Sequence, residues 1–156
     1  MIRAATNSDA SAVFEVIDSC LREIGDRVFP EGEGRDLLDI ESAYAGKGGA
    51  FVVFERDGTI AGTHATLPID RENGTVTFRR LYVRSALRGE RIGKQLMQWA
   101  IDWSRENRFR EVVFWSDTRF THAHEFFRRF GFERGETRDM DDGALPYSEY
   151  RFALKL

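Results

Sequence analysis

The chain has 156 residues, which suits one domain with a sizeable hydrophobic core. Hydrophobic residues make up 42% of the chain and charged residues 31%, and the formal net charge of -3 provides no basic excess for nucleic acid or an anionic membrane. No apolar run approaches the ~18 residues that cross a bilayer, and no signal-peptide stretch opens the chain. We therefore predict a single domain over residues 1–156, located in the cytoplasm, without nucleic-acid or membrane partners.

Metal and disulfide chemistry find little support in the sequence. The one cysteine, Cys20, excludes an internal disulfide and a cysteine-based metal cluster. His122 and His124 lie two residues apart on a predicted helix, so their side chains point to different faces. His124-Glu125 also lacks the second histidine of an H-E-x-x-H site. We predict no metal site.

The first half of the chain predicts a strand, two helices and a three-stranded meander. A strand over residues 2–5 precedes a helix over 9–24, in which apolar side chains recur at helical spacing and Gly25 is the stop. A polar loop over 27–34 leads to a second helix over 35–44. The predicted apolar side chains of this second helix are Leu37, Leu38, Ile40 and Ala43.

The meander is marked by its turns. Asp57-Gly58 and Asn73-Gly74 are strong hairpin signals. They separate predicted strands over residues 50–56, 59–69 and 75–83. The third of these strands leads into a bend and a third helix.

The second half predicts two helices and three strands. The third helix has one apolar face, formed by Ile92, Leu96, Trp99, Ala100 and Trp103. A continuous apolar strand over 111–116 is of the kind covered on both faces. A helix over 121–130 follows, and strands over 132–138 and 148–154 flank the acidic loop Asp139–Gly143. The order β-α-α-β-β-β-α-β-α-β-β predicts an α/β domain with a mixed central sheet flanked by helices.

The bend before the third helix combines two glycines with three cations, in the run Arg88-Gly89-Glu90-Arg91-Ile92-Gly93-Lys94. Glycine allows close backbone approach, and a helix N-terminus offers unpaired N–H groups that suit a phosphate. The spacing excludes the G-x-x-x-x-G-K-[ST] loop and the G-x-G-x-x-G fingerprint. A glycine-containing turn with solvated basic residues is the plain alternative.

Two motifs carry a family resemblance. LYVRSALRGERIGKQL resembles the acetyl-CoA-binding motif [Q/R]-x-x-G-x-[G/A] of the GNAT superfamily of N-acetyltransferases, with Arg88 first, Gly93 last and Arg91 in place of the middle glycine. Residues 120–132, FTHAHEFFRRFGF, resemble the A-x-x-[FL]-Y-x-x-x-G-F helix of the same superfamily. Both motifs stand in the family's order and separation, and together with the surrounding strands the resemblance covers nearly the whole chain.

The resemblance implies the GNAT fold and an acetyl-CoA-dependent N-acetyltransferase that transfers an acetyl group directly to a primary amine in a ternary complex. It implies that backbone groups of Leu81 and Val83 bind the pantetheine arm of the cofactor, and that the main-chain amide near Tyr82 polarises the thioester carbonyl. The loop over 27–34 and the second helix would form one wall of the acceptor site. The residues implied to wrap the pyrophosphate are Arg88, Gly89, Glu90, Arg91, Ile92, Gly93 and Lys94. Arg84, Arg128 and Arg129 are weaker candidates for the other phosphate, with solvated arginines as the alternative.

Proton transfer adds further candidates. A lysine-like amine with a pKa of ~10.4 is neutral only about once in 2,500 molecules at pH 7, so a base should take its proton. Base candidates are His64, His122, His124, Glu125 and Glu41. Phe127 stands where many family members have a tyrosine that protonates the departing thiolate. The nearby hydroxyls are those of Tyr82, Ser116 and Thr121, and unassisted departure of the thiolate is the alternative.

Other functions remain open at this stage. Phe127 and Arg91 also fit a non-catalytic acyl-CoA-binding domain, and the enzyme could instead use a bulkier acyl-CoA. The acceptor could be an aminoglycoside, a polyamine, an amino acid, a peptide N-terminus or a lysine side chain. The acidic loop Asp139–Asp142 could attract a cationic acceptor or be a solvated turn. The resemblance also allows a homodimer.

Overall fold

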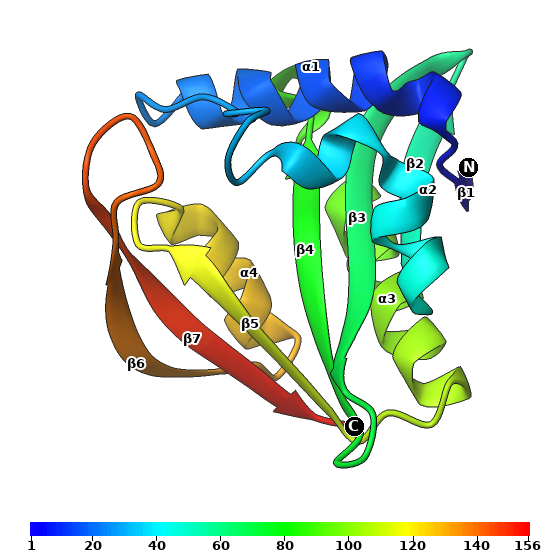
Figure 1. Ribbon diagram of the computed structural model, residues 1–156, viewed down its shortest axis with the longest axis vertical. Helices are drawn as coiled ribbons and strands as arrows, with labels where there is room; N and C mark the ends of the chain where they lie inside the picture. Colours follow the sequence, from blue (N-terminus) through cyan, green and yellow to red (C-terminus); the bar gives the residue numbers. More distant parts are fainter.

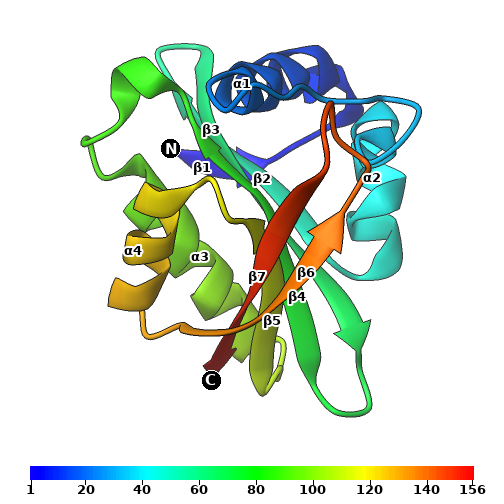
Figure 2. The same ribbon diagram turned by 90° about the vertical axis from the view of Figure 1, so that its left-hand side faces the viewer.

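The computed structural model describes residues 1–156. One seven-stranded sheet runs through the molecule in the order β1-β2-β3-β4-β5-β7-β6. Helices α1 and α2 lie on one face of this sheet and α3 and α4 on the other (Figure 1, Figure 2). All neighbouring strands are antiparallel except β4 and β5, which are parallel. The predicted α/β class, mixed sheet and order of the main elements are confirmed.

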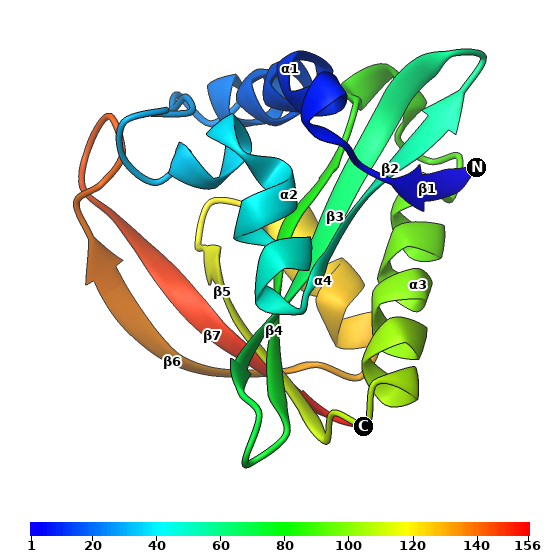
Figure 3. The same cartoon turned by 45° about the vertical axis from the view of Figure 1, so that its right-hand side comes forward.

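The N-terminal half of the sheet is covered on both faces. Its elements are β1 (Ile2–Ala4), α1 (Ala10–Arg22), α2 (Ile40–Ala43), β2 (Ala50–Arg56), β3 (Thr59–Asp70) and β4 (Thr75–Val83). Figure 3 shows α1 and α2 lying over β2, β3 and β4, with α3 on the opposite face. The helical spacing of α1 buries Val13, Val16, Ile17 and Cys20 against the sheet. Gly25, with a φ of +77°, follows the helix as predicted.

The predicted second helix over residues 35–44 is wrong as a continuous helix. Residues Arg35–Leu38 form a 3-10 turn, and α2 is a single turn that begins after Asp39. Asp39 has φ -148° and ψ 78°, which is not helical, and its side chain accepts a hydrogen bond from the Ser42 N–H as an N-cap. The break lets Leu37 and Ile40 both reach the core and leaves Leu38 65% exposed.

The C-terminal half consists of α3 (Ile92–Glu106), β5 (Glu111–Asp117), α4 (Thr121–Arg129), β6 (Glu133–Met140) and β7 (Tyr147–Lys155). Helix α3 buries Ile92, Leu96 and Ala100 as predicted, but Met97 and Ile101 are also in the core, and the two predicted tryptophans are only partly buried. Strand β6 extends into the predicted acidic loop and includes Asp139. None of the helices is long and apolar enough to cross a membrane.

Strands β4 and β5 pair only at their first residues. The register joins Thr75 to Glu111 and Val76 to Val112, and beyond this point the two strands diverge (Figure 1). The prediction that β5 is covered on both faces is wrong: Val112 and Phe114 are buried, whereas Trp115 on the other face is half-buried. The reason is that α1 and α2 cover only the N-terminal half of the sheet.

Candidate active site

A cleft of about 1020 Å³ opens where β4 and β5 diverge. Its walls are the end of α1 and the loop that follows it, the second half of β4, the end of β5, the start of α4 and the loop between β6 and β7. A second hollow of about 600 Å³ lies over the bend before α3. Val83, Arg88, Gly89, Gly93 and Phe126 line both spaces, so the cleft and the hollow are continuous.

A bulge in β4 shapes the wall of the cleft. Ala65 pairs with Arg79 and Thr63 with Tyr82, so the one β3 residue between them, His64, faces two β4 residues. Arg80 has a φ of +61°, in the left-handed region that residues other than glycine rarely adopt. Two β3 side chains contact the carbonyls of the bulge.

These two contacts are short. Thr63 Oγ1 donates to the Arg80 carbonyl at 2.7 Å, and His64 Nδ1 lies 3.1 Å from the Arg79 carbonyl. Because the carbonyl can only accept, Nδ1 is assigned as the protonated nitrogen of His64. The bulge therefore has its buried acceptors satisfied by neighbouring side chains.

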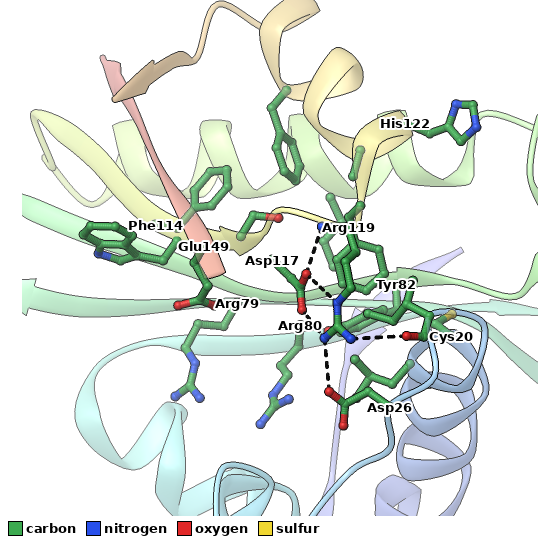
Figure 4. Close-up of a pocket in the computed structure, with 18 of the residues that line it drawn as sticks. Cys20, Asp26, Arg79, Arg80, Tyr82, Phe114, Asp117, Arg119, His122 and Glu149 are labelled. Carbon is green, nitrogen blue, oxygen red and sulfur yellow. Dashed lines mark hydrogen bonds and ion pairs between the residues drawn. The ribbon is translucent and has the colours of Figure 1, made fainter. Parts of the chain in front are cut away.

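The bulge sends both Arg79 and Arg80 toward the α2 side of the sheet (Figure 4). Arg80 is buried and forms hydrogen-bonded ion pairs with Asp36 at 2.6 Å and Glu33 at 3.2 Å. Burial alone would raise the pKa of Asp36, but the Arg80 guanidinium and the Tyr44 hydroxyl hold that pKa below its usual range. Arg79 makes no hydrogen bond or ion pair with a protein side chain, so its guanidinium is available to a ligand in the cleft.

A second charged group closes the cleft at the end of β5. Figure 4 shows Arg119 between Asp117 and Asp26, with N–O distances of 2.6 and 3.1 Å. Asp26 also accepts the backbone N–H groups of Arg27 and Ala144, and thereby joins the loop after α1 to the loop between β6 and β7. Burial opposes ionisation of Asp26, but these donors lower its pKa.

The N-terminus of α3 presents unpaired donors to the hollow. The backbone N–H groups of Gly89, Arg91, Ile92, Gly93 and Lys94 donate to no protein atom. Gly89 has a φ of +89° and Arg91 a φ of +64°. Aligned free amides at the positive end of a helix dipole form a site for an anion such as phosphate.

Comparison with known proteins places the chain in a family. Residues 13–132 match the acetyltransferase (GNAT) family. The chain belongs to that family. The chain is also similar to a solved structure, a GNAT superfamily phosphinothricin acetyltransferase from Sinorhizobium meliloti in complex with acetyl-CoA, with a TM-score of 0.79 at 18% identity over 100% of this chain and 88% of the other.

Two curated relatives show how far the similarity extends. The chain is 28% identical over 120 residues to a probable N-acetyltransferase camello from Xenopus tropicalis, covering 76% of this chain and 55% of that protein. It is 26% identical over 141 residues to an aminoalkylphosphonate N-acetyltransferase from Salmonella typhimurium, covering 88% of this chain and 87% of that protein. The chain thus spans about half of the first relative and most of the second.

The GNAT structure places the predicted cofactor residues together. Leu81, Tyr82 and Val83 line the cleft at the free edge of β4. The residues of the bend that line the adjoining hollow are Arg88, Gly89, Arg91, Ile92, Gly93 and Lys94. Glu90 lines neither space, and its carboxylate pairs with Arg56 at 3.0 Å. The side chain of Arg88 turns toward α1, where it pairs with Glu23 at 2.6 Å and contacts the Val83 carbonyl and Cys20 Sγ.

The three weaker candidates for phosphate binding, Arg84, Arg128 and Arg129, lie in different environments. Arg129 lines the hollow. Arg128 pairs with Glu125, and Arg84 pairs with Glu15. Of these three arginines, only Arg129 is therefore positioned to contact a ligand in the hollow.

The predicted catalytic residues occupy three different positions. Tyr82 lines the cleft, its hydroxyl has no protein partner, and burial raises its pKa to about 12, so the phenol stays protonated near neutral pH. His64 lines the cleft as a buried residue next to the bulge, where burial lowers its pKa to about 4 and its Nε2 has no partner. Ser116 lines the cleft, and its Oγ lies 3.1 Å from His124 Nε2.

The remaining base and acid candidates are more exposed. His122 and Thr121 line the cleft as exposed residues at the start of α4, and the His122 side chain points away from the charged group at the end of β5 (Figure 4). Glu125 forms an exposed ion pair with Arg128. Glu41 accepts the Asn7 N–H and does not line the cleft.

Several cleft residues were not predicted. The sequence pattern around Arg79 and Arg80 predicts a regular strand, and no adjacent residue indicates a bulge. Asp117-x-Arg119, directly after an apolar strand, was a usable signal because polar residues at strand ends often line sites. Asp26 carried no such signal, since its partners lie 93 and 118 residues away in the chain.

Proposed function

We propose that this GNAT protein is an acetyl-CoA-dependent N-acetyltransferase that transfers the acetyl group directly to a primary amine within a ternary complex. The observation that supports the proposal is that the cleft between the strands adjoins an anion-binding type of helix N-terminus. The opening between β4 and β5 adjoins the free amides at the N-terminus of α3. A long ligand with an anionic end and a reactive end fits this combination.

The residues present fit the donor. The free amides of Gly89, Arg91, Ile92, Gly93 and Lys94 would hold its pyrophosphate. Arg91, which replaces the usual glycine, already has the left-handed backbone that glycine favours, so the bend keeps its shape. When bound, the donor supplies the activated thioester.

Arg88 can join the phosphate site by a small rearrangement. Its ion pair with Glu23 is about half exposed on both sides, and such surface pairs contribute only about 0–1 kcal/mol. The guanidinium is therefore free to exchange Glu23 for a phosphate at little cost.

The free edge of β4 would hold the rest of the donor. Beyond Val76 this edge has no strand partner, and the main-chain groups of Leu81 and Val83 would face the opening, whereas those of Tyr82 face β3. The Val83 carbonyl accepts from both Arg88 and Cys20, which use its two lone pairs, so a ligand that binds this carbonyl would replace one of these contacts. The strand edge can thus bind a pantetheine-like chain as a further strand would bind.

The acceptor would enter from the side of the charged groups. Carboxylates of Asp117 and Glu149 lie on one wall and the unpaired Arg79 on the other. We propose a small-molecule or peptide amine as the acceptor class.

Calorimetry and kinetics test this proposal. Titration with coenzyme A should show binding, and a free-thiol assay with acetyl-CoA across a panel of amines should show turnover. Lys94→Glu places a carboxylate among the free amides and should weaken coenzyme A binding about 10-fold or more, with a smaller loss at high salt. Lys155→Glu, at the exposed end of β7, is the matched control. Unchanged affinity in Lys94→Glu would contradict the proposed phosphate site.

One observation favours a second candidate, a non-catalytic acyl-CoA-binding domain. Phe127 lines the cleft where many family members have a tyrosine, and phenylalanine cannot donate a proton. Binding of coenzyme A with no thiol release for any amine would support this candidate. Turnover with a longer acyl-CoA alone would instead indicate a bulkier donor.

A further inference from the structure

Ser116 and His124 form a hydrogen-bonded pair at the wall of the cleft. Ser116 lies near the end of β5 and lines the cleft, and its Oγ is 3.1 Å from Nε2 of His124 on α4. His124 does not line the cleft, because it stands behind Ser116 among aromatic rings. The ring centroids of Phe152 and Tyr150 lie 5.1 and 5.5 Å from that of the imidazole.

The pair lies beside the ring that replaces the family tyrosine. Phe127 follows His124 by one turn of α4, and their ring centroids are 6.1 Å apart. The Phe127 ring lines the cleft and packs edge-on against Phe114 at 4.9 Å. Ser116 and Phe127 therefore both contact or approach the His124 ring, and both line the cleft.

Ser116 differs from the other hydroxyls of the cleft. Tyr82 has no protein partner, and Tyr147 is bound to the Asp142 carboxylate. Thr121 is exposed at the start of α4. Only Ser116 combines access to the cleft with a contact to an imidazole, which can both take up and release a proton near neutral pH.

The surroundings keep the resting imidazole neutral. Burial lowers the pKa of His124, the Arg134 guanidinium acts in the same direction, and Asp117 opposes both. Tyr150 faces the ring from β7. A neutral imidazole has one nitrogen that accepts, and with Nδ1 protonated Nε2 accepts the Ser116 O–H.

We propose that Ser116 and His124 act together as a proton relay for acetyl transfer. The proposal rests on the proposed N-acetyltransferase function. As the new C–N bond forms, Ser116 Oγ takes a proton from the attacking nitrogen and gives its own proton to His124 Nε2. As the C–S bond breaks, His124 returns that proton through Ser116 to the departing sulfur. Both residues end the cycle unchanged, and the proton lost by the amine appears on the thiol.

In this scheme Ser116 is a catalytic residue, because it contacts the reacting atoms. His124 acts only through Ser116. A purely structural role for the pair, joining β5 to α4, would predict a different result. Loss of the bond would then lower stability and leave the pH dependence of the rate unchanged.

The test compares steady-state kinetics of Ser116→Ala and His124→Gln with wild type over pH 5–9. Ser116→Ala should lower kcat about 100-fold or more and leave KM for acetyl-CoA nearly unchanged, because proton transfer occurs only during the chemical step. His124→Gln should lower kcat similarly and remove the decline in rate that wild type shows as acid protonates the imidazole. Phe127→Tyr should restore at least about 10-fold of kcat to Ser116→Ala by supplying a hydroxyl from the neighbouring ring.

Ser104→Ala is the matched control, since Ser104 is a buried serine on α3 that bonds only a carbonyl of its own helix. Its kcat should equal that of wild type. If Ser116→Ala fails to fold, His124→Gln and its pH profile decide the matter. A kcat for Ser116→Ala near that of wild type, or an acid limb that persists in His124→Gln, would overturn the relay alone. Wild type that binds coenzyme A but acetylates no amine would overturn the proposed function and the relay together.

Discussion

The two halves of the sheet are built on different plans. In β2, neighbouring side chains such as Val52 and Val53 are both buried, because helices cover both faces of the sheet. In β5, Phe114 is buried but Trp115 is half-buried, and β6 is exposed along almost its whole length. Strands of the two halves pair only at Thr75–Val76 and Glu111–Val112.

The covered half of the sheet supports the residues of the cleft, and the half-covered part leaves surfaces that a ligand can contact. The fully covered half can hold a strained bulge in β4, since His64, Thr63 and the Asp36–Arg80 pair fix it from both faces. The half-covered part leaves a sheet face and a strand edge accessible in the cleft. A rigid half next to an open half gives a site that is positioned by the first and accessible through the second.

The largest expected effect compares two buried phenylalanines, one in each half. Phe51 is 4% exposed in β2 and Phe114 is 5% exposed in β5. Replacing either with alanine should lower the free energy of unfolding by about 3–5 kcal/mol, measured by urea denaturation. Only Phe114 lines the cleft, so only Phe114→Ala should also weaken coenzyme A binding in calorimetry. Equal loss of affinity in both variants would show that the halves are not separable in this way.

The next effect tests the support of the bulge. Arg80→Ala leaves the buried Asp36 carboxylate without its cation and should cost about 3 kcal/mol of unfolding free energy. Arg79→Ala, the neighbouring residue without an ion pair, is the control and should cost less than about 1 kcal/mol.

The same pair predicts a pH dependence of stability. Because the folded-state pKa of Asp36 is lowered, its contribution is complete above the unfolded pKa of about 4 and is lost as the pH falls through the folded value. Wild type should therefore lose more stability than Arg80→Ala when thermal unfolding is compared at pH 6 and pH 3. Parallel losses in the two proteins would contradict the pairing.

The smallest effect compares two buried threonines of β3. Thr63 Oγ1 donates to the Arg80 carbonyl, whereas Thr66 Oγ1 has no partner. Thr63→Val should cost about 1–2 kcal/mol because it leaves a buried acceptor unsatisfied. On the scale of about 2–4 °C per kcal/mol for a chain of this size, calorimetric Tm values resolve this difference. Thr66→Val should be neutral or stabilising, and a comparable drop in its Tm would count against the assignment.

Sequence-based prediction is accurate where an element depends on residues that are close in the chain and fails where it depends on distant residues. Strands β2 and β4 match their predicted bounds because hairpin turns and apolar patterns are local signals. The helix over 35–44 was wrong because Leu37, Ile40 and Tyr44 are drawn to a core whose shape depends on distant strands. The Ser116–His124 contact joins two residues that were predicted separately, and only packing of α4 on β5 brings them together.

The sequence by itself determined the order of the elements, the glycine-containing bend before α3 and the family, because each of these depends on residue types at short, fixed spacings. The tertiary structure alone decided the divergence of β4 and β5, the bulge at Arg80 and the ion pairs around the cleft. Those features depend on which face of the sheet is covered and on partners far away in the chain. Local patterns cannot specify such contacts, since their energies exist only when the packed layers are complete.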